Sequence, residues 1–190
     1  MKFNKDTFEI IFFARAGQGG KSAAEVLAQS AMLEGKYIQA FPYYGPERSG
    51  APTKAYVRIS SDPIRTHEPI VDPDLVVVLD DTLLGEKEVI SNLDEEESLI
   101  VNTEKTNDEI ARLVKGFKGN IKTVDASGIA IDVLEQSRPN GVILGKIAQV
   151  TDIVKLESLQ EQFKMVFGAK LPEELISKNL IAMEKGFDSI

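Results

Sequence analysis

Residues 8–35 read FEIIFFARAGQGGKSAAEVLAQSAMLEG and indicate a strand, a glycine-rich turn and a helix in direct succession. The apolar run from Phe8 to Phe13 is interrupted only by Glu9, and a short run of this kind ahead of a glycine cluster is typical of a buried strand. From residue 20 onward, small apolar residues recur every three or four positions, the spacing of one helix face, until Gly35 offers a left-handed cap. The stretch therefore predicts the first half of an α/β unit.

Further strands and helices alternate along the middle of the chain. Residues 74–80 (DLVVVLD) are almost wholly apolar, as a central parallel strand covered on both faces must be. Residues 98–102 and 121–125 have the same character, and helical patterns lie between these strands at 83–93 and 106–117. This alternation predicts a doubly wound, mostly parallel sheet of Rossmann-like connectivity.

An antiparallel hairpin and a helical end complete the predicted fold. Residues 37–41 form a second strand, and 53–59 alternate polar and apolar side chains before residues 61–63 turn the chain back into a strand at 64–66. Helices are expected at 127–136, 142–154, 156–167 and 173–187, the last with Pro172 at its first position. We expect residues 1–190 to form a single α/β domain with an inserted hairpin and a helical C-terminal third.

Composition limits the partners and the location. The chain has 22 Lys and Arg against 30 Asp and Glu, a net charge of −8, and a pI near 4.8. The electrostatic field of a protein with this negative net charge repels nucleic-acid phosphates and anionic lipid surfaces. No apolar run approaches the roughly 20 residues that a spanning helix needs, and the N-terminus has no signal-peptide pattern, so we expect a cytoplasmic protein.

The absence of cysteine restricts the chemistry most. Without cysteine there are no disulfides, no thiolate metal sites, no cysteine nucleophile and no cysteine-ligated iron–sulfur cluster. The single histidine, His67, excludes multi-histidine metal sites and is more typical of a surface residue than of a general base. Any redox centre is therefore expected on another chain, and we assign this chain neither a catalytic residue nor a metal.

The glycine turn permits several interpretations. It ends in Gly20-Lys21-Ser22 as a Walker A loop does, but Arg15 stands where that loop needs its first glycine. As a dinucleotide fingerprint it lacks the third glycine, since Ser22 occupies that position. The free N–H groups of a helix start suit an anion, but glycines here can equally serve only the tight turn and close packing.

Two acidic residues, Asp80 and Asp81, follow the central strand. At the carboxyl end of a strand they are candidates for a metal or a ribose. Capping of the helix that follows explains them more simply, and we favour that interpretation.

A second conspicuous segment is residues 41–52, FPYYGPERSGAP, between two predicted strands. Its aromatics and Arg48 could contact an anion or a partner surface. Alternatively, it is an ordered surface loop in which Arg48 pairs with Glu47. Arg15, Arg58 and Arg65 flank the two segments, and if they converge with Arg48 they form a local positive patch that suits an anion such as coenzyme A.

The ordered combination of these motifs resembles the gamma subunit, or gamma-type domain, of the 2-oxoacid:acceptor oxidoreductases, most closely the pyruvate:ferredoxin oxidoreductase branch. The resemblance is carried by ARAGQGGKSA, EGKYIQAFPYYGPERSGAPTKAYVRIS, DPIR, DPDLVVVLDDTLL and, more loosely, NGVILGKIAQVTDIVKLESLQE. These motifs span nearly the whole chain, although the family usually has glycine where this chain has Ala14.

The resemblance implies a subunit that carries no cofactor chemistry alone. In such complexes pyruvate and coenzyme A become acetyl-CoA and CO₂ with reduction of ferredoxin, using thiamine diphosphate, magnesium and iron–sulfur clusters on other chains. Alpha, beta and delta subunits are then the expected partners. The resemblance matches Gly17, Gln18 and Gly19 in the turn, which with Arg48 are candidates for contact with an anion or coenzyme A. The candidates for a partner interface are Tyr43, Tyr44, Gly45, Pro46, Glu47 and Gly50.

Two alternatives stay open. Branched-chain or other 2-oxoacids are the nearest competing substrates, because the residues that read the substrate are expected on other chains. A stand-alone nucleotide-binding α/β enzyme would instead use the glycine turn for a di- or triphosphate. If the chain is a subunit, we expect an aromatic patch centred on Tyr43, Tyr44 and Pro46, through which the isolated chain self-associates.

Overall fold

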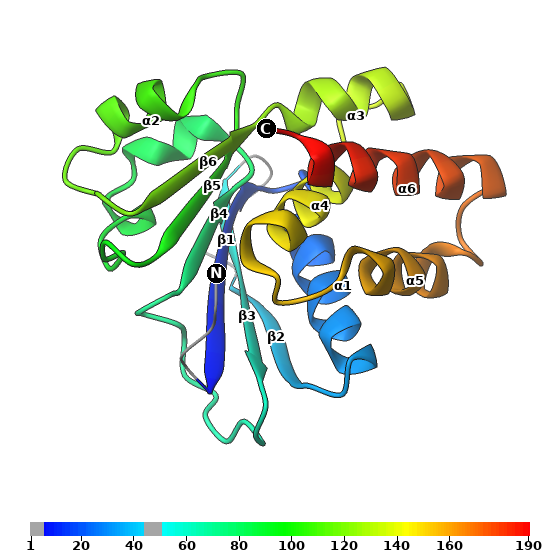
Figure 1. The fold of residues 1–190 in the computed structure, drawn as a ribbon, viewed down its shortest axis with the longest axis horizontal. Helices are drawn as coiled ribbons and strands as arrows, with labels where there is room; N and C mark the ends of the chain where they lie inside the picture. The colour runs from blue at the N-terminus through cyan, green and yellow to red at the C-terminus, as the bar shows by residue number, and fades with distance from the viewer. Residues whose placement is uncertain (1–5, 44–50) are drawn as a thin grey trace.

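A six-stranded sheet with the strand order β2-β3-β1-β4-β5-β6 organises the protein (Figure 1). The computed structural model describes residues 6–43 and 51–190. The strands are β1 (Thr7–Arg15), β2 (Tyr37–Tyr43), β3 (Pro52–Ser60), β4 (Leu75–Val78), β5 (Ser98–Asn102) and β6 (Asn120–Val124). All strands except β3 share one direction, because β3 pairs antiparallel with both β1 and β2 while β1, β4, β5 and β6 pair in parallel. The predicted Rossmann-like, mostly parallel α/β fold is confirmed.

The helices divide unequally between the two faces of the sheet. On one side of the sheet lie α1 (Gly20–Leu33), α3 (Ala126–Leu134) and α4 (Asn140–Thr151). On these helices pack α5 (Leu156–Phe167) and α6 (Glu173–Asp188). The other side is covered by the short 3-10 helices η1 (Asp81–Gly85) and η2 (Lys87–Val89) and by α2 (Asn107–Leu113). The sheet has a hydrophobic core on each side, and the central strand β1 contributes side chains to both. Phe12 packs into the core beneath α1, and Phe13 packs into the core on the opposite side.

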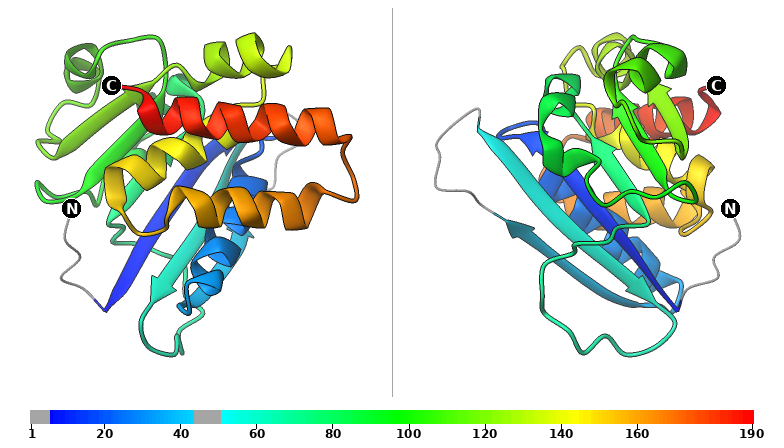
Figure 2. Two further views of the ribbon diagram at one scale, coloured as in Figure 1. Left: turned by 45° about the vertical axis from the view of Figure 1, so that its right-hand side comes forward. Right: turned by 90° about the vertical axis from the view of Figure 1, so that its left-hand side faces the viewer.

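The thinner layer leaves part of the sheet without a helix. Figure 2 shows β2 and β3 with no helix over the side that carries η1, η2 and α2 further along the sheet. We call this region the open sheet face and define it by Phe41, Tyr43, Lys54 and Tyr56, of which Tyr43 is exposed and Tyr56 is buried. Lys54 pairs with Glu88 of η2 at its border. The aromatic rings pack on one another, with 5.1 Å between the ring centroids of Phe41 and Tyr56.

The helical layer on the other side is held by a backbone contact between α4 and α6. A Cβ atom added at Gly145 would lie 1.9 Å from the carbonyl oxygen of Met183, and one added at Gly186 would lie 2.0 Å from that of Val142. The two helices can approach this closely because neither glycine has a side chain. Next to this contact, Lys146 is buried and its Nζ donates to the carbonyl oxygen of Ser189 across 2.8 Å.

Several boundaries differ from the predictions. Residues 64–66 form no strand, and β3 pairs with β2 and β1 instead, because Pro63 interrupts the backbone donors and residues 61–63 do not reverse the chain into a ladder. The predicted helix at 83–93 is two 3-10 turns, in which each N–H bonds three residues back, as Leu83 does to Asp80. Pro172 caps α6 rather than opening it.

Membrane insertion finds no support in the helices. Within residues 6–43 and 51–190, none is both long and apolar enough to cross a bilayer.

Candidate functional site

The turn between β1 and α1 depends on its glycines. Gly17 and Gly19 have φ angles of +99° and +84°, which side-chain-bearing residues rarely adopt. Gly20 packs α1 onto β1 so closely that an added Cβ would lie 2.9 Å from the Cβ of Ala14. The role of these glycines in turn geometry and close packing is thereby confirmed, while ligand binding by the turn stays a prediction.

Gln18 connects this turn to the end of β4. Its Oε1 accepts from the backbone N–H of Arg15 at 2.7 Å, and its Nε2 donates to Oδ2 of Asp80 at 2.8 Å. The guanidinium of Arg15 lies 3.3 Å from the same carboxylate and also donates to the hydroxyl of Thr82. The amide of Gln18 is thus already occupied at both ends.

Asp80 is both a helix cap and the centre of this network. Its Oδ1 accepts from the backbone N–H of Thr82 at 3.1 Å and from the hydroxyl of that residue at 2.5 Å, which confirms the predicted capping role. Burial alone would raise the pKa of Asp80, but the hydrogen bonds from Thr82 and Gln18 and the charge of Arg15 outweigh it and lower the pKa. The carboxylate is therefore firmly ionised.

Asp81 anchors a second set of contacts. Its Oδ2 accepts from the hydroxyl of Thr103 at 2.8 Å and pairs with the ammonium of Lys105. The bond from Lys105 lowers the pKa of Asp81 most, burial opposes it, and the bond from Thr103 lowers it further. Asp80 and Asp81 thus point to different partners, one toward β1 and the other toward β5.

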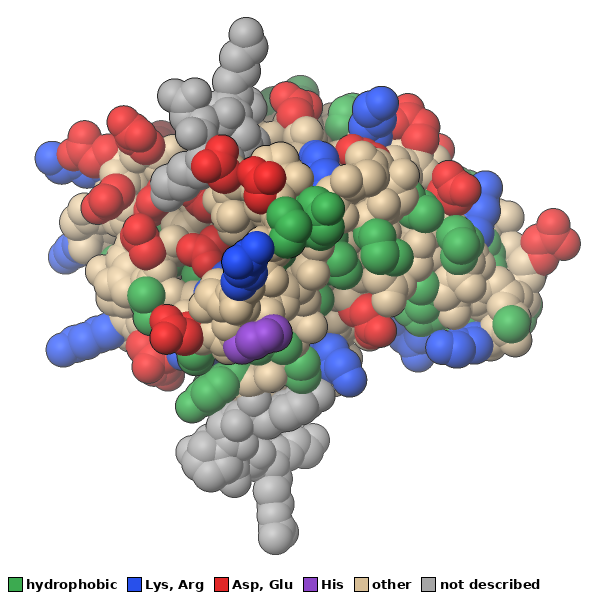
Figure 3. All heavy atoms as spheres, turned by 90° about the horizontal axis from the view of Figure 1, so that it is seen from below, with side chains coloured by type: hydrophobic (Ala, Val, Ile, Leu, Met, Phe, Trp, Pro, Cys, Tyr) green, Lys and Arg blue, Asp and Glu red, His purple; other side chains and the backbone are tan. Residues whose placement is uncertain are grey.

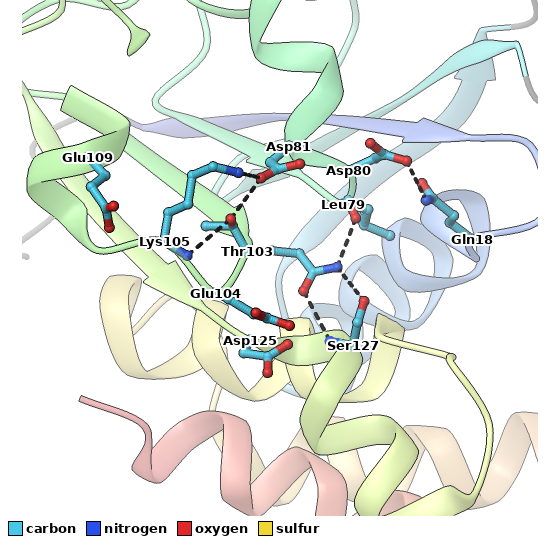
Figure 4. Close-up of a pocket in the computed structure, with 11 residues that line it drawn as sticks. Gln18, Leu79, Asp80, Asp81, Thr103, Glu104, Lys105, Glu109, Asp125 and Ser127 are labelled. Carbon is cyan, nitrogen blue, oxygen red and sulfur yellow. Dashed lines mark hydrogen bonds and ion pairs between the residues drawn. The ribbon is translucent and has the colours of Figure 1, made fainter. Parts of the chain in front are cut away.

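These residues border a pocket of about 580 Å³ at the carboxyl ends of β1, β4, β5 and β6 (Figure 4). Asn102 braces its floor, donating to the carbonyl oxygen of Leu79 and the hydroxyl of Ser127, both at 2.9 Å, and accepting from the backbone N–H of Ser127. The pocket is lined by Gln18, Leu79, Asp80, Asp81, Asn102, Thr103, Glu104, Lys105, Glu109, Asp125 and Ser127.

The position of the pocket follows from the connectivity. The chain leaves β1 toward one face of the sheet through α1 and leaves β4 toward the opposite face through η1, so a crevice opens between the ends of these neighbouring strands. Ligands of open α/β sheets bind at such switch points. This pocket is accordingly the candidate site of the chain.

The lining of the pocket is acidic. Five carboxylates face a single ammonium, that of Lys105, with Arg15 at the border. Besides Asp80, two of these carboxylates act at helix starts: Glu109 accepts from the backbone N–H of Thr106, and Asp125 accepts from that of Gly128. A negatively charged ligand is disfavoured here, whereas hydroxyl groups and cations suit the lining. Among the described residues, no three His, Asp or Glu side chains come together in a way that could hold a metal ion.

The structure places only part of the second conspicuous segment. Tyr43 is 51% exposed on the open sheet face, and Ala51 accepts a hydrogen bond from the N–H of Ala16 beside the glycine turn. The remaining candidates lie outside the described residues: Tyr44, Gly45, Pro46, Glu47, Arg48 and Gly50.

The expected arginine patch does not form between Arg15 and Arg58. Arg58 is buried and pairs with Glu9 at 2.5 Å, whereas Arg15 lies opposite Pro52 at the other end of the ladder. Six residues of strand separate these positions, about 20 Å. His67 is exposed, with Nδ1 at 2.9 Å from the amide of Gln39, in agreement with a surface role.

Sequence reasoning did not single out Asn102, Thr103, Lys105, Asp125 and Ser127. The signal that could have found them is their place directly after the apolar runs at 98–101 and 121–124, where polar residues meet at one edge of a parallel sheet.

Comparison with known proteins identifies related chains. The family model for pyruvate ferredoxin/flavodoxin oxidoreductase matches residues 9–189. The pyruvate synthase subunit PorC of Thermotoga maritima is 43% identical over 190 residues, covering 100% of this chain and 98% of the relative. The common gamma subunit of the pyruvate/ketoisovalerate oxidoreductases of Thermococcus kodakarensis is 46% identical over 180 residues, 95% of each chain.

Solved structures agree with these similarities. The crystal structure of the Thermotoga maritima subunit superposes with a TM-score of 0.86 at 40% identity and 96% coverage of both chains. A 2-oxoglutarate:ferredoxin oxidoreductase of Magnetococcus marinus has the same fold, with a TM-score of 0.80 at 20% identity over 96% of this chain and 31% of that one.

Proposed function

Because the chain belongs to the pyruvate ferredoxin/flavodoxin oxidoreductase family, we propose that it is the gamma subunit of a cytoplasmic multisubunit pyruvate:ferredoxin oxidoreductase. The complex would convert pyruvate, coenzyme A and oxidised ferredoxin into acetyl-CoA, CO₂ and reduced ferredoxin. The observation that carries the proposal is the end-to-end similarity to a pyruvate synthase subunit, which leaves no large part of either chain unmatched. Residues 1–190 would act as one gamma-type domain.

The residues of this chain do not fit an iron–sulfur cluster, because it has no cysteine. This supports a division in which clusters, thiamine diphosphate and magnesium belong to the alpha, beta and delta chains. The carboxylates of Asp80 and Asp81, which line the pocket, both accept hydrogen bonds from other residues of this chain. We therefore assign the subunit a structural role and no catalytic residue.

Docking on the larger subunits is proposed to use the open sheet face. The exposed ring of Tyr43 stacks edge-on against Tyr56, with 6.3 Å between ring centroids, and the ammonium of Lys54 lies 5.9 Å from the ring of Tyr43. Interfaces are enriched in such aromatic anchors. The adjoining candidates Tyr44, Gly45, Pro46, Glu47 and Gly50 would extend this surface, and a permanent subunit interface should bury more than roughly 2,000 Å².

Contact with coenzyme A is a separate part of the proposal. Gly17, Gln18 and Gly19 would offer backbone groups to it, and Arg48 would supply positive charge. The Asp80 carboxylate next to Gln18 pairs with Arg15 and leaves no excess positive charge at the turn, so binding of a phosphate would rely on Arg48. The same carboxylate disfavours the alternative of a stand-alone nucleotide-binding enzyme.

A second candidate function is a gamma subunit shared between two oxidoreductases. The observation that favours it is the 46% identity to the common gamma subunit of Thermococcus kodakarensis. Such a chain would serve both a pyruvate and a branched-chain 2-oxoacid enzyme.

The proposal is tested by anaerobic purification of the native chain through a tag. We expect larger subunits to accompany it and the preparation to reduce a viologen dye in the presence of pyruvate and coenzyme A. Activity with 3-methyl-2-oxobutanoate, from a second set of accompanying subunits, would establish the shared gamma subunit. Recovery of the chain alone with tight nucleotide binding would contradict both candidates.

A further inference from the structure

The outer edge of β2 is a second candidate interface, at which backbone groups of an edge strand can bond another strand. The sheet ends at this strand, which pairs only with β3 in the described part of the chain. None of its seven residues, YIQAFPY, carries a charge. Edge strands of soluble proteins are usually protected by charges, irregularity or a covering element, because unpaired backbone groups attract another strand.

The opposite edge of the same sheet is protected. On β6, Lys122 supplies a charge, and the N–H of Thr123 is bonded to Oδ1 of Asn107 at 2.9 Å. Among the described residues, the β6 edge therefore has a charge and a side-chain acceptor, whereas β2 itself has no charged side chain.

The hydrogen-bond pattern shows which groups of β2 point outward. The N–H of Ala16 donates to Ala51 and that of Ser61 donates to Asp6, so the odd-numbered residues of β3 direct their backbone groups toward β1. The even-numbered residues of β3 then bond the odd-numbered residues of β2, which leaves Ile38, Ala40 and Pro42 facing the free edge. Pro42 fits this assignment, since a proline without an N–H belongs on the solvent side of an edge strand.

About Ala40, β2 has a tyrosine at both outer positions and apolar residues at 38 and 42, whereas Gln39 and Phe41 differ in character. If two copies pair antiparallel with Ala40 opposite Ala40, Tyr37 of each copy lies opposite Tyr43 of the other, and Ile38 lies opposite Pro42. The two tyrosines are 49% and 51% exposed, and the pairing brings each against an aromatic ring. The two Ala40 residues would exchange both backbone bonds, and each Ile38 N–H would donate to the Pro42 carbonyl oxygen of the other copy.

A groove beside the strand completes the surface. It lies between α1 and β2, has a volume of about 210 Å³, and its apolar lining includes Ala24, Ala28, Ile38 and Ala40. Met32 and Leu33 at the end of α1 and Tyr37 at the start of β2 are also exposed hydrophobic residues. Figure 3 shows hydrophobic side chains among charged ones on the face of the molecule seen from below. Antiparallel pairing would bring the two grooves together on one face of the joined sheet.

We propose that the β2 edge is a homodimer interface, at which two copies of this chain join their sheets about a two-fold axis at Ala40. Self-complementarity commits the edge to a second copy, because the same residues supply both halves of every contact. The inference does not depend on the oxidoreductase activity, but the interface shares Tyr43 with the open sheet face.

The absence of cysteine allows a direct test with Ala40→Cys in the full-length chain. Directly opposite residues in a hydrogen-bonded pair have Cα atoms about 5.5 Å apart, within the roughly 4.4–6.8 Å that a disulfide requires. We expect mild oxidation to link most of the protein into covalent dimers. Ile38→Cys is the matched control, because the two copies of position 38 would be about 13 Å apart along the strands.

A mixture of Tyr37→Cys and Tyr43→Cys gives a second readout. The proposal expects disulfides between the two variants and none in either variant alone. Equal cross-linking of Ala40→Cys and Ile38→Cys would indicate random collision and would overturn the proposal.

Light scattering measures the interface without cross-linking. The wild-type chain should be a dimer, and Ala40→Glu, which places two like charges opposite each other at an exposed position, should raise the dimer dissociation constant at least about tenfold. Leu113→Glu, at another exposed hydrophobic position, should leave it unchanged. A monomeric wild-type chain would overturn the proposal. Hydrogen exchange gives a further test, because protection of the β2 backbone amides only after other subunits bind would also overturn it.

Discussion

The side-chain amide of Gln18 donates to Oδ2 of Asp80 across 2.8 Å, and this bond fastens the glycine turn after β1 to the end of the neighbouring strand β4. The turn is therefore supported from outside as well as by its own glycines. A partner that contacts this edge of the sheet in an assembled enzyme would therefore bind a turn whose conformation is already fixed.

Replacement of Asp80 tests the network directly. Asp80→Ala removes the cap on Thr82 and the partner of both Gln18 and Arg15, so the free energy of unfolding should fall by about 1–3 kcal/mol. Urea titration at neutral pH measures the change. Glu96→Ala, at an exposed carboxylate, should alter stability by less than about 0.5 kcal/mol, and an equal loss in both variants would contradict the role of the network.

Acid should weaken the same network. The pKa values of Asp80 and Asp81 lie below their usual value of 3.8, so near that pH the unfolded chain binds more protons than the folded chain. The stabilisation is present in full above pH 3.8 and is lost as the pH falls through the lowered values. The stability difference between wild type and Asp80→Ala, measured by urea titration at several pH values, should therefore shrink below pH 3.8. A difference that grew instead would contradict the assignment.

The α4–α6 contact should tolerate no side chain. Gly145→Ala would place a Cβ 1.9 Å from a backbone oxygen that cannot move without displacing α6, and we expect a loss of about 3 kcal/mol in unfolding free energy. In the same helix, Gly141→Ala meets its nearest atom only at 3.7 Å and gains helix propensity, so it should be neutral or stabilising by up to about 1 kcal/mol. Thermal unfolding of the two variants measures the contrast, and similar melting temperatures would contradict the close approach.

The buried Lys146 predicts that stability rises at alkaline pH, in contrast to the loss of stability that Asp80 and Asp81 predict in acid. Burial, with a contribution from Lys122, lowers the pKa of this lysine below its usual value of 10.5. Between the lowered pKa and 10.5, the unfolded chain binds more protons than the folded chain. Below this pH window the buried charge lowers the free energy of unfolding by its full amount, and this loss disappears as the pH rises through the window.

Lys146→Met should match or exceed wild-type stability at neutral pH, because it fills the same space without a charge and Gln149 still donates to the Ser189 carbonyl oxygen. Its stability should lack the alkaline rise that Lys146 contributes to the wild type. Chemical unfolding between neutral pH and pH 10 compares the two proteins. A Lys146→Met variant far less stable than wild type would show that the ammonium is a necessary anchor.

A substitution of Tyr43 distinguishes an effect on subunit docking from an effect on folding. Tyr43→Ala removes a half-exposed ring, so stability should change by less than about 1 kcal/mol, whereas affinity for the larger subunits should drop at least about tenfold if this ring anchors the interface. Co-purification and titration with the other subunits provide the measurement. Leu113→Ala, at a residue of similar exposure on α2, should leave the affinity unchanged.

Local patterns predicted the elements whose residues obey one clear periodicity. The helix expected at 156–167 is α5 at the same bounds, and the apolar runs at 98–102 and 74–80 contain β5 and β4. Errors concentrate where hydrogen bonding over three residues competes with helix formation, as after Asp80, and where a proline follows a strand, as at Pro63.

The candidate site was predicted only in part, because it is assembled from four strand ends. Gln18 could be identified from the turn motif, but its partner Asp80 is 62 positions away and only the parallel pairing of β1 with β4 brings the two together. Thr103, Lys105 and Ser127 stand shortly after predicted strands, but only the strand order shows that they meet at one pocket. The insertion of β3 between β1 and β2 is likewise a matter of long-range pairing.

The arrangement of the thick helical layer has a consequence for the order of synthesis. Ile10, Phe12 and Val77 belong to the same hydrophobic core as buried residues of α4, α5 and α6, which come from the last part of the chain to be translated. While a ribosome still holds that part, the strands can pair, but this side of the sheet has only α1 and α3 to cover it. The nascent protein therefore leaves this core incompletely covered until translation is nearly complete, at the stage when chaperones meet growing chains.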